Sequence, residues 1–276
     1  MTAQLQCGRF RLSLERPLIM GVVNVTPDSF SDGGRFLDPD AAIAHARRLA
    51  EEGADLIDIG AESSRPGAAA VVSAAEELRR LLPVLRGLRD LPLSVDTVKP
   101  EVMRAALAEG AAMINDINAL RAPGTLDAVA AGDAALCLMH MQGNPGTMQQ
   151  HPHYGEVVAE VKAFLRERID SARTAGIAPE RIVVDPGFGF GKTLQHNLEL
   201  LRRLREFADL GVPVLAGWSR KSSLGTITGR PAGERLAASI AAALIAAQNG
   251  AAILRVHDVA ATRDALSVLA AVENDR

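Results

Sequence analysis

The sequence predicts an α/β fold, a single-domain (β/α)8 TIM barrel with a short β-hairpin at its N-terminus. From residue 18 onward, short β-branched runs alternate with longer segments of helical period, and this alternation repeats eight times. A chain of 276 residues has the length of one such barrel. No linker, low-complexity tract or internal repeat beyond the strand–helix unit interrupts the pattern, so we assign residues 1–276 to one domain.

Residues 1–17 alternate apolar and polar side chains around Gly8, which predicts the hairpin. The same segment carries Arg9, Arg11 and Arg16 where a signal peptide would need an apolar core. The eight strands are then predicted from apolar runs, in chain order 18–24, 55–60, 93–96, 112–117, 135–141, 181–187, 213–217 and 252–258.

The helices are predicted over 39–52, 74–89, 99–109, 124–132, 155–175, 195–208, 233–249 and 259–273. Several begin at Asp or Pro and end at Gly, the residues that helix ends prefer. Strict alternation implies parallel strands joined by right-handed crossovers. A doubly wound open sheet is the alternative, but polar residues follow nearly every strand, which favours a barrel whose strand ends converge on one active site.

Composition excludes several classes of protein. Lys and Arg number 30 against 33 Asp and Glu, and aromatic residues make up only 3%, which argues against nucleic-acid binding. The longest apolar run, 236–247, is interrupted by Ser239 and predicts a buried helix rather than a membrane span. Cys7 and Cys137 are too isolated for a disulfide framework or a zinc site. We expect a cytoplasmic protein with no membrane partner.

Four loops after strands are longer than usual, at 25–38, 61–73, 142–154 and 218–232, and such loops are often functional. The first follows Asn24 and contains Asp28 and Asp32, whose hard oxygens suit Mg²⁺. A simple turn-forming stretch is an equally good interpretation of it. In the second, Arg65 lies beside two serines and could clamp a phosphate or carboxylate, or could simply be solvated.

The segment from Asp185 to Thr193 is not a phosphate-binding loop, because Pro186 stands where that motif needs Gly. An acid at a strand end suits an amide- or guanidine-like ligand edge, and Phe190 could cover a flat ligand. The segment after the seventh strand carries Arg220 and Lys221, and we expect it to enter a helix. Together with Arg255 and His257 these two residues predict an anion site. No nucleophile elbow is present, so positioning and electrostatics are expected to dominate catalysis.

Seven motifs in order cover nearly the whole chain: MGVVNVTPDSFSDGG, DIGAESSRPGA, LSVDT, INDI, DPGFGFGKT, GWSRKSSLG and RVHDV. Together they closely resemble the dihydropteroate synthases of the folate pathway. The resemblance implies a barrel, commonly a homodimer, that joins 4-aminobenzoate to (7,8-dihydropterin-6-yl)methyl diphosphate with Mg²⁺. Diphosphate would leave first, giving a pterin-stabilised cation that the amine attacks.

The resemblance also implies roles for individual residues. The pterin is expected to contact Asp96, Asn115, Met141, Asp185 and Lys221. The diphosphate is expected to contact Asn24, Arg65, Arg255 and His257, with Asn24 also holding Mg²⁺. The 4-aminobenzoate is expected among Phe30, Ser64, Pro66, Phe190, Lys221 and Ser222. Catalytic roles are implied for Asp32, Arg65 and Lys221.

The chain departs from the usual family pattern at Ala61, Ser64 and Trp218. We expect these differences to adjust affinity for 4-aminobenzoate or its sulfonamide mimics, with Trp218 narrowing the pocket. Two other functions stay open, a pterin-binding methyltransferase that works with a corrinoid protein and a non-catalytic paralogue. The methyltransferase needs no diphosphate clamp, and a paralogue would be expected to lose Asn24, Asp32 or Arg65, all of which are present.

Overall fold

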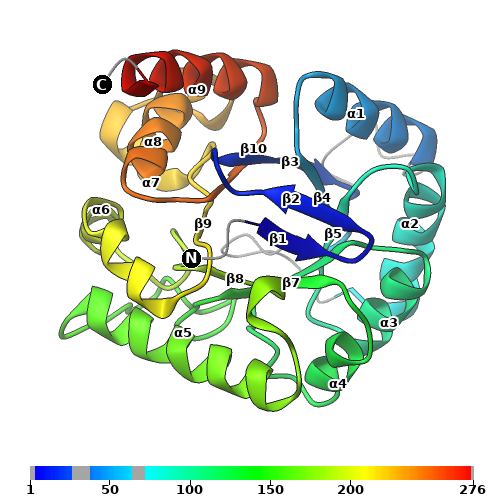
Figure 1. Cartoon of the computed structure of the whole chain (residues 1–276). Helices are drawn as coiled ribbons and strands as arrows, with labels where there is room; N and C mark the ends of the chain where they lie inside the picture. Colours follow the sequence, from blue (N-terminus) through cyan, green and yellow to red (C-terminus); the bar gives the residue numbers. More distant parts are fainter. Residues whose placement is uncertain (1–3, 27–37, 64–71, 275–276) are drawn as a thin grey trace.

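A computed structural model describes residues 4–26, 38–63 and 72–274 of the chain. Within these residues, eight parallel strands form one sheet in the order β8-β7-β6-β5-β4-β3-β10-β9 (Figure 1). The strands are β3 (Leu18–Asn24), β4 (Leu56–Gly60), β5 (Leu93–Asp96), β6 (Met113–Asp116), β7 (Ala135–Met139), β8 (Ile182–Asp185), β9 (Leu215–Ala216) and β10 (Ile253–Val256).

The two edge strands of this sheet meet, so the sheet is a barrel. A parallel bridge joins Val184 to Val214, and the Val184 amide donates to the Pro213 carbonyl oxygen at 3.0 Å. The (β/α)8 prediction is therefore confirmed, and the doubly wound open sheet is wrong.

A layer of helices surrounds the barrel (Figure 1). They are α1 (Pro39–Glu51), α2 (Ala74–Gly87), α3 (Pro100–Ala108), α4 (Thr125–Ala130), α5 (Val157–Thr174), α6 (Leu194–Arg202), α7 (Ser222–Thr228), α8 (Leu236–Gln248) and α9 (Val259–Asn274). Side chains define several helix starts, as where Asp38 and Ser73 accept hydrogen bonds from the first turns of α1 and α2. No helix among the described residues is both long and apolar enough to cross a membrane.

Two predicted helices differ from the structure. The segment predicted over 195–208 divides into α6 and the 3-10 helix η3 (Leu204–Leu210). The helix predicted over 233–249 begins only at Leu236, because the preceding residues form the 3-10 turn η4 (Ala232–Glu234). A third 3-10 turn, η2 (Pro179–Arg181), leads into β8.

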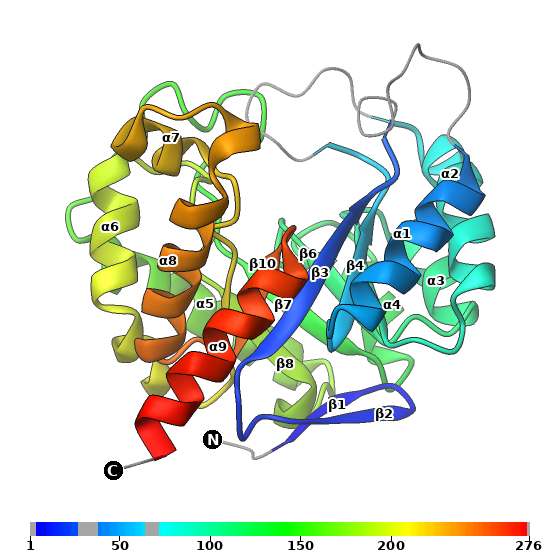
Figure 2. The same ribbon diagram turned by 90° about the horizontal axis from the view of Figure 1, so that it is seen from above.

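The predicted N-terminal hairpin is confirmed as β1 (Gln4–Cys7) paired antiparallel with β2 (Phe10–Ser13). Figure 2 shows it lying across the end of the barrel where the strands begin. Its buried Leu5 and Cys7 share one apolar cluster with residues from inside the barrel, among them Met20, Met113 and Val183. The hairpin therefore forms an apolar floor to the barrel.

Strand register determines which side chains enter the barrel above this floor. Residues two apart on a strand face the same side. Leu56, Met113, Val183 and Ile253 belong to the floor cluster. The residues two positions further along these strands therefore face the barrel interior, one layer nearer the carboxyl ends: Asp58, Asn115, Asp185 and Arg255.

Candidate active site

One cation faces two carboxylates inside the barrel. The Arg255 guanidinium lies 2.7 Å from Asp58 Oδ2 and 3.4 Å from Asp96 Oδ2. Asn115 Nδ2 also donates to Asp58 Oδ2, at 3.2 Å. Asp58 has no exposed surface, so its charge is compensated by these neighbours rather than by water. The cluster therefore links β4, β5, β6 and β10.

The second carboxylate of this cluster, Asp96, is less well paired than the first. Its burial and the nearby Asp58 carboxylate raise the pKa of Asp96 to about 7, although the Arg255 charge acts in the opposite direction. In an unfolded chain an Asp carboxyl has a pKa of about 4. Asp96 can therefore carry a proton near neutral pH and donate a hydrogen bond as well as accept one.

This shift predicts a pH dependence of stability. A carboxyl whose pKa is raised by folding stabilises the fold below its unfolded pKa and loses that contribution as pH rises through about 7. We expect the free energy of unfolding of the wild type to fall relative to that of Asp96→Asn between about pH 5 and pH 8. Urea unfolding of both proteins across this range measures the difference, and parallel curves would contradict the assignment.

A second polar pair lies at the end of β8. Asp185 is 6% exposed, and its Oδ1 accepts a hydrogen bond from the Gly187 amide at 2.7 Å. Burial raises the pKa of Asp185, opposed by the Lys221 charge. Lys221 Nζ donates to the Phe188 carbonyl oxygen and lies 4.9 Å from the centre of the Phe190 ring. Burial lowers the pKa of Lys221 to about 8, opposed by Asp185.

Glycines allow the loop after Asp185 to lie against the loop after β7. A Cβ atom on Gly187 would lie 1.9 Å from the His140 carbonyl oxygen, and one on Gly191 would lie 2.4 Å from that of Gln142. Both glycines also have positive φ, at 70° and 61°. The glycines of this motif therefore serve close backbone packing, which agrees with rejecting a phosphate-binding loop.

Two residues at the predicted anion site after β9 lie in contact. Ser219 Oγ lies 2.9 Å from His257 Nδ1, which joins the ends of β9 and β10. Arg220 does not lie with them. Arg220 has a φ of 58° and its guanidinium pairs with Asp258, leaving Lys221 as the cation beside Asp185.

Comparison with known proteins decides the family. Residues 20–257 match the family model described as pterin binding enzyme. The dihydropteroate synthase of Haemophilus influenzae is 50% identical over 266 residues, which cover 95% of this chain and 96% of that protein.

This chain belongs to the dihydropteroate synthase family.

Solved structures of the family have the same fold. The Xanthomonas albilineans dihydropteroate synthase with 4-aminobenzoic acid superposes with a TM-score of 0.93 at 58% identity, covering 99% of both chains. The Burkholderia cenocepacia dihydropteroate synthase complexed with 7,8-dihydropteroate gives a TM-score of 0.90 at 54% identity, covering 99% of this chain and 97% of that one.

Among the site residues that the family resemblance implies, the structure brings together those at the ends of strands. Asp96, Asn115 and Arg255 share the first cluster, while Asp185, Lys221 and Phe190 share the second. Met141 is buried beside Phe190 in a small apolar cluster. Asn24 ends β3, Ser222 begins α7, and His257 lies next to Ser219. Phe30, Asp32, Ser64, Arg65 and Pro66 lie outside the described residues.

Sequence analysis missed the buried Asp58. It stands in the middle of the strand LIDIG rather than at its end, where we looked for polar groups. An acid inside an apolar run, in register with the inward positions, is the signal that could have found it. Of the three departures from the family pattern, Ala61 and Trp218 lie in the described residues. Ala61 is buried, and the ring of Trp218 packs with its centre 5.1 Å from that of Phe188.

Hydrogen bonds and ion pairs fix the base of the second long loop, residues 61–73. Glu62 accepts a hydrogen bond from the Val72 amide at 2.9 Å and pairs with Lys99. Lys99 Nζ also lies 2.7 Å from the fully buried Glu77. These contacts bring the two described ends of the 61–73 loop together.

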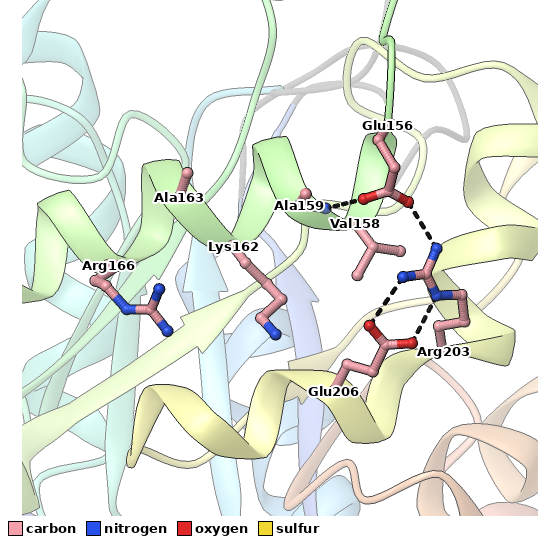
Figure 3. Close-up of a pocket in the computed structure, with 8 residues that line it drawn as sticks. All are labelled: Glu156, Val158, Ala159, Lys162, Ala163, Arg166, Arg203 and Glu206. Carbon is pink, nitrogen blue, oxygen red and sulfur yellow. Dashed lines mark hydrogen bonds and ion pairs between the residues drawn. The ribbon is translucent and has the colours of Figure 1, made fainter.

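A hollow on the outer helical layer does not belong to this site. Figure 3 shows it between α5 and η3, with a volume of about 220 Å³. Arg203 in its wall pairs with Glu156 and Glu206, and Lys162 pairs with Asp209. The charges are thus satisfied locally, and the hollow contains none of the residues expected to bind substrates.

Proposed function

We propose that this chain, as one pterin-binding barrel domain over residues 1–276, is a dihydropteroate synthase. It joins (7,8-dihydropterin-6-yl)methyl diphosphate to 4-aminobenzoate and releases diphosphate. The observation that carries the proposal is the meeting of Asp185, Lys221 and Arg255 inside one end of the barrel, where barrel enzymes place their active sites. Two relatives of the same fold, each more than 50% identical to this chain, have structures with 4-aminobenzoic acid and with 7,8-dihydropteroate bound.

Asp185 is the group we assign to the pterin's hydrogen-bond donors. A carboxylate can accept two parallel hydrogen bonds from the 2-amino group and the neighbouring ring N–H, and buried charge-assisted bonds are strong. Its Oδ1 also accepts from Gly187, which keeps the carboxylate oriented. Asn115 and Asp96 supply the remaining polar contacts, Lys221 lies near the pterin carbonyl, and Met141 forms part of the apolar wall.

The leaving diphosphate is assigned to basic residues at the other strand ends. Arg255 and His257 lie on β10 and just after it, and Arg65 comes from the second loop. Fixed cations stabilise the charge that develops on a leaving group. We infer a dissociative reaction in which Asp32 favours the transient pterin cation and the amine then attacks, with the ring of 4-aminobenzoate near Phe30, Ser64, Pro66, Phe190 and Ser222.

A magnesium ion fits the residues at the end of β3. Asn24 offers a hard amide oxygen, and Mg²⁺ commonly takes one or two protein oxygens together with substrate phosphates and water. When bound, Mg²⁺ would neutralise charge on the diphosphate. Among the residues described, no group of three or more His, Cys, Asp or Glu forms a metal cluster.

The reaction is tested by measuring diphosphate release. We expect release with Mg²⁺ that requires both the dihydropterin diphosphate and 4-aminobenzoate. Lys221→Ala should lower the rate about tenfold, the effect of losing one charge-assisted hydrogen bond. Lys162→Ala, which removes a lysine paired with Asp209 on the outer surface, should leave the rate unchanged. Tight pterin binding without release that depends on 4-aminobenzoate would indicate the paralogue or methyltransferase function instead.

We also propose a homodimer formed through α7, α8 and α9. Among the described residues, the large apolar side chains with the greatest exposure lie on these helices: Ile227, Leu236, Ile245, Val268 and Val272. Exposed apolar groups gathered on one side of a protein mark interaction surfaces. Sedimentation should give twice the mass of one chain, and Ile245→Glu should shift it toward the monomer. A monomeric wild type at tens of micromolar would contradict the proposal.

A further inference from the structure

Lys192 is a buried lysine to which neither the family resemblance nor the proposed mechanism assigns a role. It is 3% exposed, and no carboxylate pairs with it directly in the described structure. Its Nζ instead lies 2.9 Å from the Gly187 carbonyl oxygen, 3.0 Å from that of Phe190 and 3.3 Å from that of His140. It also lies 3.0 Å from His140 Nδ1.

His140 is suited to accept a hydrogen bond from this amine. Burial and the Lys192 charge lower the pKa of His140 to about 2, so its ring is neutral. The ring is held edge-on against Phe164, with the two centres 4.9 Å apart. A neutral imidazole has one nitrogen able to accept, and Nδ1 is the ring nitrogen that lies against the Lys192 amine. Lys192 is thus surrounded by four acceptors that do not carry a full charge.

These acceptors come from the ends of two neighbouring strands. His140 directly follows β7 and precedes Met141, while Gly187 and Phe190 belong to the loop that begins at Asp185. The carbonyl oxygens of this tight loop would repel one another if no donor were placed among them. Burial lowers the pKa of Lys192 well below its usual value. Its amine group therefore holds together, by hydrogen bonds, the segments that carry two of the residues assigned to the pterin, Met141 and Asp185.

We infer that Lys192 is a positioning residue that sets the orientation of Asp185 for pterin binding, an inference that rests on the proposed function. It acts through the backbone of residues 187–190. Removing the amine leaves three carbonyl oxygens and the His140 nitrogen without their donor, so the loop relaxes away from the arrangement in which Asp185 faces the barrel interior.

A built-in reporter distinguishes this role from a general structural one. Trp218 is the only tryptophan in the sequence, and its ring packs against Phe188, in the middle of the same loop. A matched control is Arg181, another buried basic residue, whose guanidinium donates to backbone carbonyls, those of Ala134 at 2.9 Å and Val129 at 3.0 Å. Those carbonyls lie before β7, away from the loop.

The experiment compares Lys192→Met with Arg181→Met. Calorimetric titration with the dihydropterin diphosphate should show binding weakened at least tenfold for Lys192→Met and less than twofold for Arg181→Met. Acrylamide quenching of Trp218 fluorescence, measured without substrate, should increase only in Lys192→Met.

If Lys192→Met does not fold, His140→Leu serves instead, because it removes one acceptor and leaves the three carbonyl contacts in place. It should produce the same two changes, to a smaller extent. Unchanged affinity and unchanged quenching in the folded variant would overturn the inference. Failure of the wild type to bind the pterin would instead refute the proposed function, while the quenching comparison would still decide whether Lys192 holds the loop.

Discussion

Replacing Arg255 with Met is expected to lower the free energy of unfolding by about 3–5 kcal/mol, the usual cost of leaving a buried charge without its partner. Asp58 has no exposed surface, and Arg255 is the cation nearest to it, at 2.7 Å. Asn115 contributes one hydrogen bond to Asp58 but no positive charge. Urea unfolding at about pH 8, above the pKa of about 7 of Asp96, measures the loss while that carboxyl is mostly ionised.

A matched control is Arg220→Met. Arg220 also pairs with an aspartate, Asp258, but its side chain is 42% exposed, so its loss should cost less than about 1 kcal/mol. The double variant Asp58→Asn, Arg255→Met should recover part of the stability, because it removes the charge that Arg255 compensates. Equal losses in Arg255→Met and Arg220→Met would show that the buried cluster has no special energetic role.

Asp185→Asn is expected to weaken binding of the dihydropterin diphosphate by about 3 kcal/mol, which is about a hundredfold. The amide can still accept from Gly187 through one oxygen, so the fold around it is preserved. Its other atom, however, becomes an N–H donor that faces the donors of the pterin and cannot pair with them. Calorimetric titration of the folded variant measures the change in affinity.

The control for this substitution is Asp258→Asn, which changes an aspartate that pairs with Arg220 after β10. Its pterin affinity should match that of the wild type. If the Kd of Asp185→Asn for the dihydropterin diphosphate were within a factor of three of the wild-type value, the assignment of Asp185 would be wrong. Another group would then have to accept the hydrogen bonds of the pterin.

Local pattern was enough to predict the barrel, because each strand and each helix is encoded by the period of its own apolar residues. It was also enough to find Asp185, Asn115 and Arg255, since these polar residues stand at or near strand ends. The pairing of Arg255 with Asp58 was missed because it joins positions 197 residues apart in sequence. Only closure of the barrel brings them together.

The two remaining differences have a similar cause. Arg220 and Lys221 are adjacent cations with the same local context, yet a positive φ at Arg220 sends one guanidinium to Asp258 while Lys221 lies beside Asp185. No role was predicted for Lys192, because Pro186 rules out a phosphate-binding loop at this motif. The backbone carbonyls that accept hydrogen bonds from Lys192 cannot be recognised from residue type. Side-chain direction at loop positions is decided by tertiary contacts rather than by residue type.

The hairpin floor has a kinetic consequence. Since Leu5 and Cys7 cover the barrel where its strands begin, we expect substrates to reach the residues assigned to them only from the carboxyl ends of the strands. Two ligands that arrive from the same end must then follow an order of arrival. Whichever molecule lies against the inner layer of Asn115 and Asp185 enters first and departs last. An excess of the outer molecule therefore traps the inner one, and exchange at the deeper position becomes slow whenever the outer position is filled.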